Sequence, residues 1–215
     1  MRVEPASAVV GHVAVPGDKS ISHRAVLLGA VGEGETRVRG FGRAGDTQST
    51  VRAMRALGIE IEDVADDELL IQGGELRSGA VDCENAGTLM RLLAGLLAGR
   101  QGRFELTGDE SLSARPMERI AEPLRRMGAR FETTDGHAPL VIDGSSLHGI
   151  DYELPVASAQ VKSAILLGGL TADGETTVVE PVPTRDHTEL MLESAGVRVL
   201  RRPSAVTIEP ASSLH

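Results

Sequence analysis

Polar and basic side chains stand at the start of an apolar stretch in PGDKSISHR, residues 16–24, which runs directly into AVLLGAV. Ammonium, guanidinium and hydroxyl groups at the start of a helix can bind anions, because the first turn leaves backbone N–H groups free and carries the positive end of the helix dipole. Two later stretches repeat this arrangement: Asn85, Gly87 and Thr88 open one apolar run, and Ser158 and Gln160 open another. Any one such residue is typically a helix cap. Three sets together predict a binding site for an anionic small molecule.

Lysine is rare in this chain. Of 22 basic residues only Lys19 and Lys162 are lysines. Two explanations are open: a general drift toward arginine with two survivors, or two places where a compact ammonium is needed and a planar guanidinium does not fit. Lys162 lies two residues beyond Gln160, roughly 200° around a helix, so we expect it to face away from the ligands.

Six helices are predicted to position these residues. Three segments are apolar around most of their circumference and are expected to be buried; they are 21–31, 86–99 and 157–170. Three others have one apolar face and are expected to lie outside; they are 46–57, 116–127 and 186–195. Buried helices in similar surroundings are expected to run parallel, which brings their N-termini to one end of the domain.

The chain repeats itself. Gly58, Gly128 and Gly196 each follow a one-sided helix, are spaced about 70 residues apart, and suit the left-handed position that closes a helix. Short β-branched segments such as TRVRG and TTVVE predict strands between the helices. The sequence therefore predicts an α+β fold of three repeated βαβαββ-type units with pseudo-threefold symmetry, at about 16–80, 81–150 and 151–215.

Composition excludes several classes of protein. A formal charge of −9 and 2% aromatic residues argue against a nucleic-acid partner or an anionic membrane surface. Cys83 is the only cysteine, which excludes an internal disulfide and a cysteine-rich zinc site, and the histidines show no metal-binding spacing. No apolar run approaches the length of a membrane span and no leader is recognisable, so a cytoplasmic protein is expected.

Five motifs, in this order and at these spacings, resemble the 5-enolpyruvylshikimate-3-phosphate synthase family: PGDKSISHR, ENAGTLMR, the ARP of SLSARPMER, ASAQVKSA and PTRDHTE. The resemblance covers essentially the whole chain and implies an enolpyruvyl transferase-like fold. Three of the motifs are similar to the family's second class, which includes glyphosate-insensitive members, whereas Gly87 resembles the sensitive pattern. The resemblance implies transfer of the enolpyruvyl group of phosphoenolpyruvate to the 5-hydroxyl of shikimate 3-phosphate, with release of phosphate and with no metal or organic cofactor.

The resemblance also implies site residues. Those matched to shikimate 3-phosphate are Lys19, Ser20, Arg24, Ser158, Ala159, Gln160 and Arg185. Those matched to phosphoenolpyruvate are Lys19, Gly87, Arg115 and Gln160, with Arg91 adding positive charge nearby. Lys19 is in addition the matched catalytic residue, expected to stabilise charge in the transition state. Without the resemblance, Ser20 would be a helix cap, Arg24 a charge on a helix surface and Arg115 a loop residue.

Two further residues have simpler interpretations. His23 is expected to be a structural histidine with satisfied hydrogen bonds. Cys83 is expected to behave as a small buried hydrophobic residue.

By resemblance the family enzyme has six such units in two domains, and this sequence holds three. We expect 16–215 to form its N-terminal domain, with the C-terminal domain absent and residues 1–15 packing with that second domain. The groups that complete proton transfer match no position here. A complementing C-terminal half is therefore an expected partner, the complete enzyme is expected to be a monomer, and this chain alone is expected to bind shikimate 3-phosphate weakly and turn over negligibly.

Three alternatives remain open: an enolpyruvyl transferase acting on UDP-N-acetylglucosamine, a non-catalytic module that binds shikimate phosphate, and a structural domain whose motifs only cap helices. The first would show Lys-Asn in place of Lys19-Ser20 and usually a cysteine near residue 115. Ligand titration separates the other two.

Overall fold

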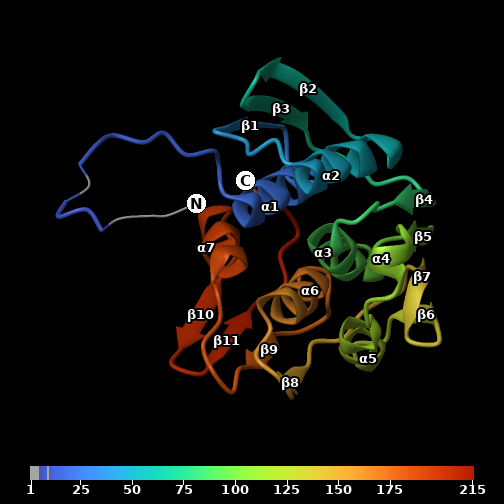
Figure 1. Cartoon of the computed structure of the whole chain (residues 1–215). Coiled ribbons are helices and arrows are strands. Elements are labelled where there is room, and N and C mark those ends of the chain that lie inside the picture. The colour runs from blue at the N-terminus through green and yellow to red at the C-terminus, as the bar shows by residue number, and fades with distance from the viewer. Residues whose placement is uncertain (1–4, 9) are drawn as a thin grey trace.

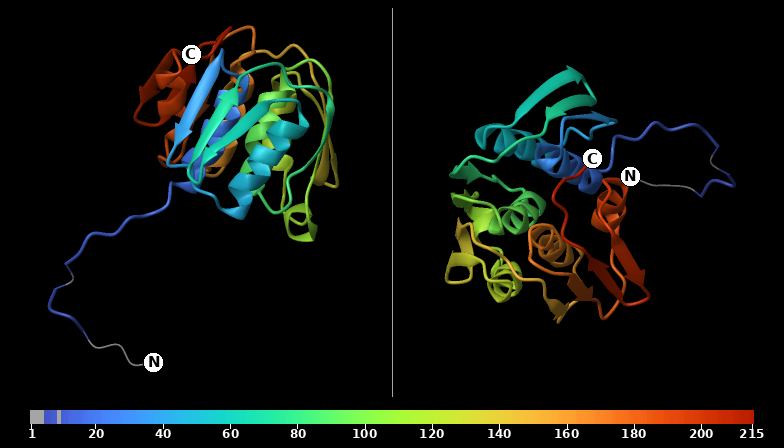
Figure 2. Two further views of the ribbon diagram at one scale, coloured as in Figure 1. Left: turned by 90° about the horizontal axis from the view of Figure 1, so that it is seen from above. Right: turned by 180° about the vertical axis from the view of Figure 1, so that it is seen from behind.

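Three sheets form the outer faces of the molecule, and helices fill the space between them (Figure 1). The structure is a computed structural model and describes residues 5–8 and 10–215. Each sheet belongs to one stretch of sequence, so the chain goes once around the molecule in three consecutive units, as the two further views also show (Figure 2).

The first unit has two helices and three strands. Its elements are α1 (Lys19–Val31), β1 (Glu35–Arg39), α2 (Gly45–Ala56), β2 (Glu60–Ala65) and β3 (Glu68–Gln72). The strands form an antiparallel sheet in the order β1-β3-β2.

The second unit begins with a strand and has an extra short helix. Its elements are β4 (Gly79–Asp82), α3 (Gly87–Ala98), β5 (Arg103–Thr107), α4 (Glu110–Ser113), α5 (Glu118–Arg126), β6 (Arg130–Thr134) and β7 (His137–Asp143). The sheet order is β4-β5-β7-β6, and β4 pairs with β5 in parallel.

The third unit repeats this order. Its elements are β8 (Asp151–Glu153), α6 (Ala159–Gly169), β9 (Thr176–Val179), α7 (His187–Ser194), β10 (Val199–Arg202) and β11 (Ala205–Ile208). The sheet order is β10-β11-β9-β8, and β8 pairs with β9 in parallel.

The predicted βαβαββ unit is therefore found in the second and third units, but the prediction needs a correction in the first. In the described part of the chain the first unit has no strand before α1. Strand β4 starts at Gly79, inside the range predicted for the first unit, yet it pairs with β5 of the second. The physical reason is that hydrogen bonds to a neighbouring strand hold a leading strand in place. The unit to which such a strand belongs therefore depends on the sheet with which it pairs, and sequence spacing alone does not show this.

The helices follow their apolar patterns. Almost every residue of α3 and α6 is buried, and α1 is buried from Ser22 to Ala30 apart from partly exposed Ala25. The outer helices α2, α5 and α7 are each buried on one face, as predicted. A Cβ atom on Gly95 of α3 would lie 2.1 Å from the Ala164 carbonyl oxygen of α6, so glycine is needed for these two helices to touch.

The three glycines predicted to close the outer helices do so. Their φ angles are +93° for Gly58, +98° for Gly128 and +88° for Gly196, which are left-handed values that glycine adopts without strain. A strand begins two residues or more after each of them.

Residues 5–8 and 10–15 lie outside the three units. They are exposed and form neither helix nor strand, and they extend away from the body of the molecule (Figure 2). The rest of the N-terminal segment predicted at 1–15 lies outside the described residues. None of the helices that the structure describes is long and apolar enough to cross a membrane.

Candidate functional site at the three helix starts

A pocket of about 200 Å³ lies where α1, α3 and α6 begin. Its lining comes from all three helix starts and from the loop before α7, and comprises Asp18, Lys19, Ser20, Arg24, Thr88, Ala159, Gln160 and Arg185. Three cationic side chains face one carboxylate in this lining. The arrangement favours an anionic ligand, because the ends of three helix dipoles and a net positive charge act on the same small volume.

Most of the residues expected at the shikimate 3-phosphate site are brought together here. Six of the seven line the pocket, and Ser158 stands just outside the lining. Its hydroxyl accepts a hydrogen bond from the Val161 N–H and so caps α6. Gly87 and Arg115, expected to contact phosphoenolpyruvate, do not line the pocket but lie beside it, next to Thr88.

Sequence reasoning missed Asp18 as a member of the pocket. Its carboxylate caps α1 by accepting a 2.8 Å hydrogen bond from the Ile21 N–H. That bond is the main reason why the pKa of Asp18 lies below its ordinary value. An aspartate directly before an apolar helix is a typical N-cap, and this was the signal that could have placed it.

Lys19, at the start of α1, and Arg185, in the loop before α7, both offer cationic groups to the pocket. The Lys19 ammonium group is half-exposed and lies 2.8 Å from the Asp46 carboxylate of α2. Arg185 is exposed, and among the described residues it makes no side-chain hydrogen bond or ion pair. Both side chains can therefore turn toward an anion without leaving a buried partner unpaired.

Arg24 is built into the wall of the pocket. The side chain is buried, so the alternative interpretation of an exposed charge on the helix surface is wrong. Its Nε donates to Thr188 Oγ1 (2.6 Å), Nη1 to Ser20 Oγ (2.6 Å) and Nη2 to Ser163 Oγ (2.8 Å). Burial lowers the pKa of Arg24 to about 10, which leaves the guanidinium charged at neutral pH.

The partners of Arg24 show what sequence reasoning left out. Thr188 and Ser163 come from α7 and α6, so three helices hold one guanidinium in place. Thr188 lies in the quoted TRDHTE motif and Ser163 in ASAQVKSA, but nothing in their spacing indicates that they contact Arg24. A fixed guanidinium costs little entropy when it binds a carboxylate or phosphate.

Gln160 connects α6 to α3. Its carbonyl Oε1 accepts from Arg91 Nη1 (3.1 Å), and its Nε2 donates to Thr88 Oγ1 (2.9 Å). Burial is the main cause that lowers the pKa of Arg91, and the nearby charges of Arg115 and Arg119 lower it further. Gln160 therefore touches both the pocket and a second group of cations.

That second group surrounds Gly87. A Cβ atom there would lie 2.9 Å from Arg115 Nη1 and 2.9 Å from Arg91 Nη1, so the absence of a side chain leaves room for two guanidinium groups. Arg115 also donates to Asn85 Oδ1. In the described chain neither arginine forms an ion pair with a carboxylate, and two partly buried cations side by side favour a second anion at this point.

Lys162 lies behind the site, as expected from its position on the helix. It is 1% exposed, and its ammonium group lies 2.8 Å from Glu180 Oε2 and 2.6 Å from Glu189 Oε1. Glu189 follows Thr188, the residue that accepts from Arg24. The buried ion triad thus anchors the part of α7 that supports the pocket.

Of two other buried residues, Cys83 behaves as predicted and His23 does so in part. His23 is a structural histidine whose Nδ1 lies 2.6 Å from Thr50 Oγ1, and burial lowers its pKa to about 4, so it is neutral at pH 7. Its Nε2 has no hydrogen-bond partner among the residues that the structure describes, which differs from the expectation of a fully satisfied ring. Cys83 is fully buried, and burial raises the pKa of its thiol to about 12.

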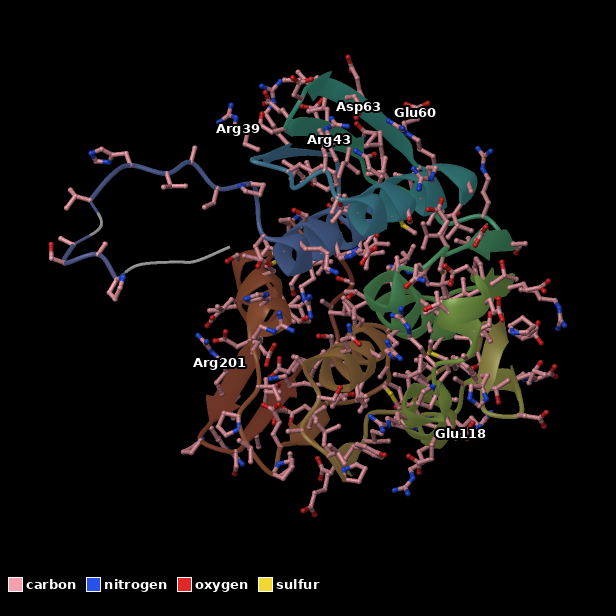
Figure 3. The ribbon with its side chains drawn as sticks, in the orientation of Figure 1. Arg39, Arg43, Glu60, Asp63, Glu118 and Arg201 are labelled. Atoms are coloured by element: carbon pink, nitrogen blue, oxygen red, sulfur yellow. The ribbon has the colours of Figure 1, made fainter. Side chains whose placement is uncertain are left out.

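Part of the acidic charge of the chain lies on outer elements. Glu60 and Asp63 stand on the outer sheet of the first unit and Glu118 on α5, each at the periphery of the molecule (Figure 3). Asp63 is held by Arg43 at 2.7 Å. A charge of −9 over the whole chain is therefore compatible with local attraction of anions, because exposed charges more than about 10 Å apart are largely screened. No cluster of three metal-binding side chains occurs among the described residues.

Comparison with known proteins identifies the family to which the chain is similar. The family model for EPSP synthase (3-phosphoshikimate 1-carboxyvinyltransferase) matches residues 3–215. The 3-phosphoshikimate 1-carboxyvinyltransferase of Acidithiobacillus ferrooxidans is 54% identical over 204 residues, which are 93% of this chain and 47% of the relative. That of Alkalilimnicola ehrlichii is 52% identical over 220 residues, or 99% of this chain and 49% of the relative.

A solved structure supports the same relationship. The EPSP synthase of Acinetobacter baumannii superposes with a TM-score of 0.91 at 48% identity, covering 95% of this chain and 48% of that one. The chain thus spans about half the length of the relatives it matches, and it adopts the fold of the corresponding part of an EPSP synthase. On this match across nearly its whole length, the chain belongs to the EPSP synthase (3-phosphoshikimate 1-carboxyvinyltransferase) family.

Proposed function

We propose that this chain supplies the shikimate 3-phosphate site and half of the phosphoenolpyruvate site of an enzyme that transfers an enolpyruvyl group. The new bond joins the 5-hydroxyl oxygen of shikimate 3-phosphate to the enolpyruvyl carbon of phosphoenolpyruvate, and inorganic phosphate leaves. The observation that carries this proposal is the meeting of three helix starts with Lys19, Arg24 and Arg185 around one pocket.

In this proposal the pocket holds shikimate 3-phosphate. The cap of α6, formed by Ser158, Ala159 and Gln160, binds its phosphate by donating hydrogen bonds from free N–H groups and from the Ser158 O–H. Arg24 and Ser20 bind its other polar groups, and Arg185 covers it from the loop before α7. The fixed geometry of Arg24 supports this role, because three hydroxyl groups hold it before any ligand arrives.

Phosphoenolpyruvate lies beside it, at the pair of arginines around Gly87. Arg115 and Arg91 bind its charged groups, and Gln160 lies between the two ligands. Lys19 stands at the pocket with a half-exposed ammonium group and stabilises the charge that develops during transfer.

Activity requires more than this chain. By resemblance to the family, the groups that move protons to and from the reaction intermediate belong to a complementing C-terminal half, with which residues 1–15 pack in the complete enzyme. A site without those groups binds substrate but lacks an acid and a base in the right places. A second candidate is a non-catalytic module that binds shikimate phosphate, and it is supported by the pocket at the three helix starts, whose lining consists of binding groups. The match to the EPSP synthase model favours both over a transferase acting on UDP-N-acetylglucosamine.

The test is calorimetric titration of the chain with shikimate 3-phosphate. We expect one saturable site, whose affinity falls at least tenfold in Arg185→Ala and in Arg24→Ala. Arg103→Ala is the matched control, because Arg103 is exposed on β5 and its side chain pairs with Asp143 on the same sheet. Arg185→Ala keeps the test decisive if loss of buried Arg24 unfolds the chain. No binding by folded wild-type chain contradicts the proposal, and phosphate release by the chain alone contradicts its dependence on a second half.

A further inference from the structure

The hydroxyl group of Ser20 links the pocket to a residue outside its lining. Ser20 belongs to the lining, at the start of α1. Its Oγ accepts a hydrogen bond from Arg24 Nη1 (2.6 Å) and lies 3.0 Å from Nδ1 of His187, the first residue of α7. His187 is not among the residues that line the pocket. A histidine outside the lining is therefore hydrogen-bonded to a group inside it.

The direction of this hydrogen bond decides what Ser20 offers to a ligand. A serine hydroxyl has one hydrogen and two lone pairs, and Arg24 can only donate, so it occupies one lone pair. If Nδ1 of His187 accepts, it takes the only hydrogen, and Ser20 presents a lone pair to the pocket. If Nδ1 donates, both lone pairs are occupied and the hydrogen is free to point into the pocket. Only the second arrangement helps to bind an anion.

The charge beside His187 favours the second arrangement. Asp18 Oδ1 lies 4.0 Å from the same Nδ1 atom. The Ile21 N–H donates to this carboxylate and lowers the pKa of Asp18, so the carboxylate is ionised at neutral pH. A negative charge next to one ring nitrogen favours a proton on that nitrogen. Nδ1 carries this proton in one of the two neutral tautomers and in the charged imidazolium, so the direction of the bond is the same in both.

Thr88, at the start of α3, is held in a comparable way. Arg91 Nη1 donates to Gln160 Oε1 (3.1 Å), which turns the amide nitrogen of Gln160 toward Thr88 Oγ1 (2.9 Å). An amide nitrogen can only donate, so the Thr88 hydroxyl accepts this bond and keeps its hydrogen for the pocket, whose lining includes Thr88. At both helix starts, a donor from another helix thus occupies the oxygen of a pocket hydroxyl.

We propose that His187 is a positioning residue of this site: its Nδ1–H donates to Ser20 Oγ and leaves the Ser20 hydroxyl to donate to an anionic oxygen of shikimate 3-phosphate. The identity of the ligand rests on the proposed function. His187 touches no ligand and acts only through Ser20. A hydrogen bond to a charged acceptor is stronger than one between neutral groups, so a Ser20 hydroxyl turned the other way binds the ligand more weakly.

Two variants of matched size test the direction of the bond. His187→Asn places an amide near the position of Nδ1 and can still donate to Ser20, whereas His187→Asp offers only acceptor oxygens, which take the Ser20 hydrogen. Because aspartate also adds negative charge near the pocket, both variants are made again in a Ser20→Ala background, where the side chain at position 187 cannot act through the hydroxyl. The dissociation constant for shikimate 3-phosphate, measured by calorimetry, is compared in this double-mutant cycle.

We expect His187→Asn to bind within about threefold of the wild type, and His187→Asp to bind at least about tenfold more weakly than His187→Asn. In the Ser20→Ala background the ratio between the two dissociation constants should be at least about fivefold smaller. Equal ratios in the two backgrounds would show that position 187 acts through charge alone, and would overturn the proposal.

His148→Asp is the matched control for the added charge. His148 is exposed, its Nδ1 also lies near a carboxylate, that of Asp173 at 2.8 Å, and it is not among the residues that line the pocket. The affinity of His148→Asp for shikimate 3-phosphate should equal that of the wild type. A loss as large as that of His187→Asp would also overturn the proposal.

The position of the ring proton can be observed directly in the chain without ligand. Long-range proton–nitrogen correlation spectra of protein with isotope-labelled histidine distinguish a protonated from a bare Nδ1, and the His187 signal is identified by its absence in His187→Asn. We expect Nδ1 of His187 to carry a proton at neutral pH, with and without shikimate 3-phosphate. A bare Nδ1 would overturn this inference and leave the proposed function intact. Absence of shikimate 3-phosphate binding by the folded wild-type chain would instead refute the proposed function, and with it the ligand assigned to Ser20.

Discussion

Replacement of Lys162 by methionine removes the charge behind the site and keeps a side chain of similar length. The ammonium group of Lys162 is 1% exposed and is the shared partner of two buried carboxylates, at 2.8 Å from Glu180 and 2.6 Å from Glu189. Removing one member of a buried ion pair leaves uncompensated charge in a medium of low polarity, which costs about 3–5 kcal/mol. In a domain with a free energy of unfolding of about 5–15 kcal/mol, that is a large share of the total.

The chain supplies its own control, because the only other lysine is exposed. Lys19 pairs with Asp46 at 2.8 Å, and the two side chains are 55% and 34% exposed. Lys19→Met is expected to change the free energy of unfolding by less than about 1 kcal/mol. The assay is urea unfolding followed by circular dichroism at pH 7, with the free energy extrapolated to water.

Lys162→Arg decides between the two explanations for the rare lysines. A large loss of stability in it supports a site shaped for an ammonium group, and no loss supports compositional drift. If Lys162→Met costs no more than Lys19→Met, the reasoning about the buried triad is refuted.

Three further predictions concern single residues around the site. Because burial lowers the pKa of His23 to about 4, the folded chain binds fewer protons than the unfolded chain between pH 6.5 and 4. In urea unfolding, the free energy of unfolding of the wild type should therefore fall by about 2–3 kcal/mol more than that of His23→Gln between pH 7 and pH 4.5. Equal losses would contradict this. Gly87→Ala places a methyl group 2.9 Å from Arg91 and Arg115. Calorimetry in the presence of shikimate 3-phosphate should then show phosphoenolpyruvate bound about tenfold more weakly, with the affinity for shikimate 3-phosphate unchanged. Weaker binding of shikimate 3-phosphate with unchanged binding of phosphoenolpyruvate would show that phosphoenolpyruvate does not bind at Gly87. The Cys83 thiol, with its pKa raised to about 12 by burial, should react with a thiol reagent at least about 100-fold more slowly in the native chain than in urea, and fast native reaction would show that β4 opens.

The helices could be predicted well because their signals are local. Apolar runs and closing glycines placed six helices, and the left-handed φ angles at Gly58, Gly128 and Gly196 match the predicted ends. The leading strand of each unit was harder, because its position depends on which sheet accepts it. Strand β4 therefore lay across a predicted boundary between units, and the open edge of β1 had no signal in local sequence.

The candidate site was predictable in part for a similar reason. Residues at helix starts could be grouped because the repeat brings helix starts together, and the pocket contains Lys19, Arg24 and Gln160. Burial of Arg24 could not be predicted, since its partners Thr188 and Ser163 are about 140 to 160 residues away in sequence and reach it only through packing. A polar residue on a predicted buried helix is the one hint, because buried charges need partners.

The central claim is that three helix starts from three repeats form one anion site, and hydrogen–deuterium exchange with and without shikimate 3-phosphate tests it most directly. Bound anion should slow exchange of the N–H groups in the first turns of α1, α3 and α6 together, while β6 and β7, on the outer sheet of the second unit, stay unchanged. Protection confined to a single helix start, or found in β6 and β7 instead, would contradict the account.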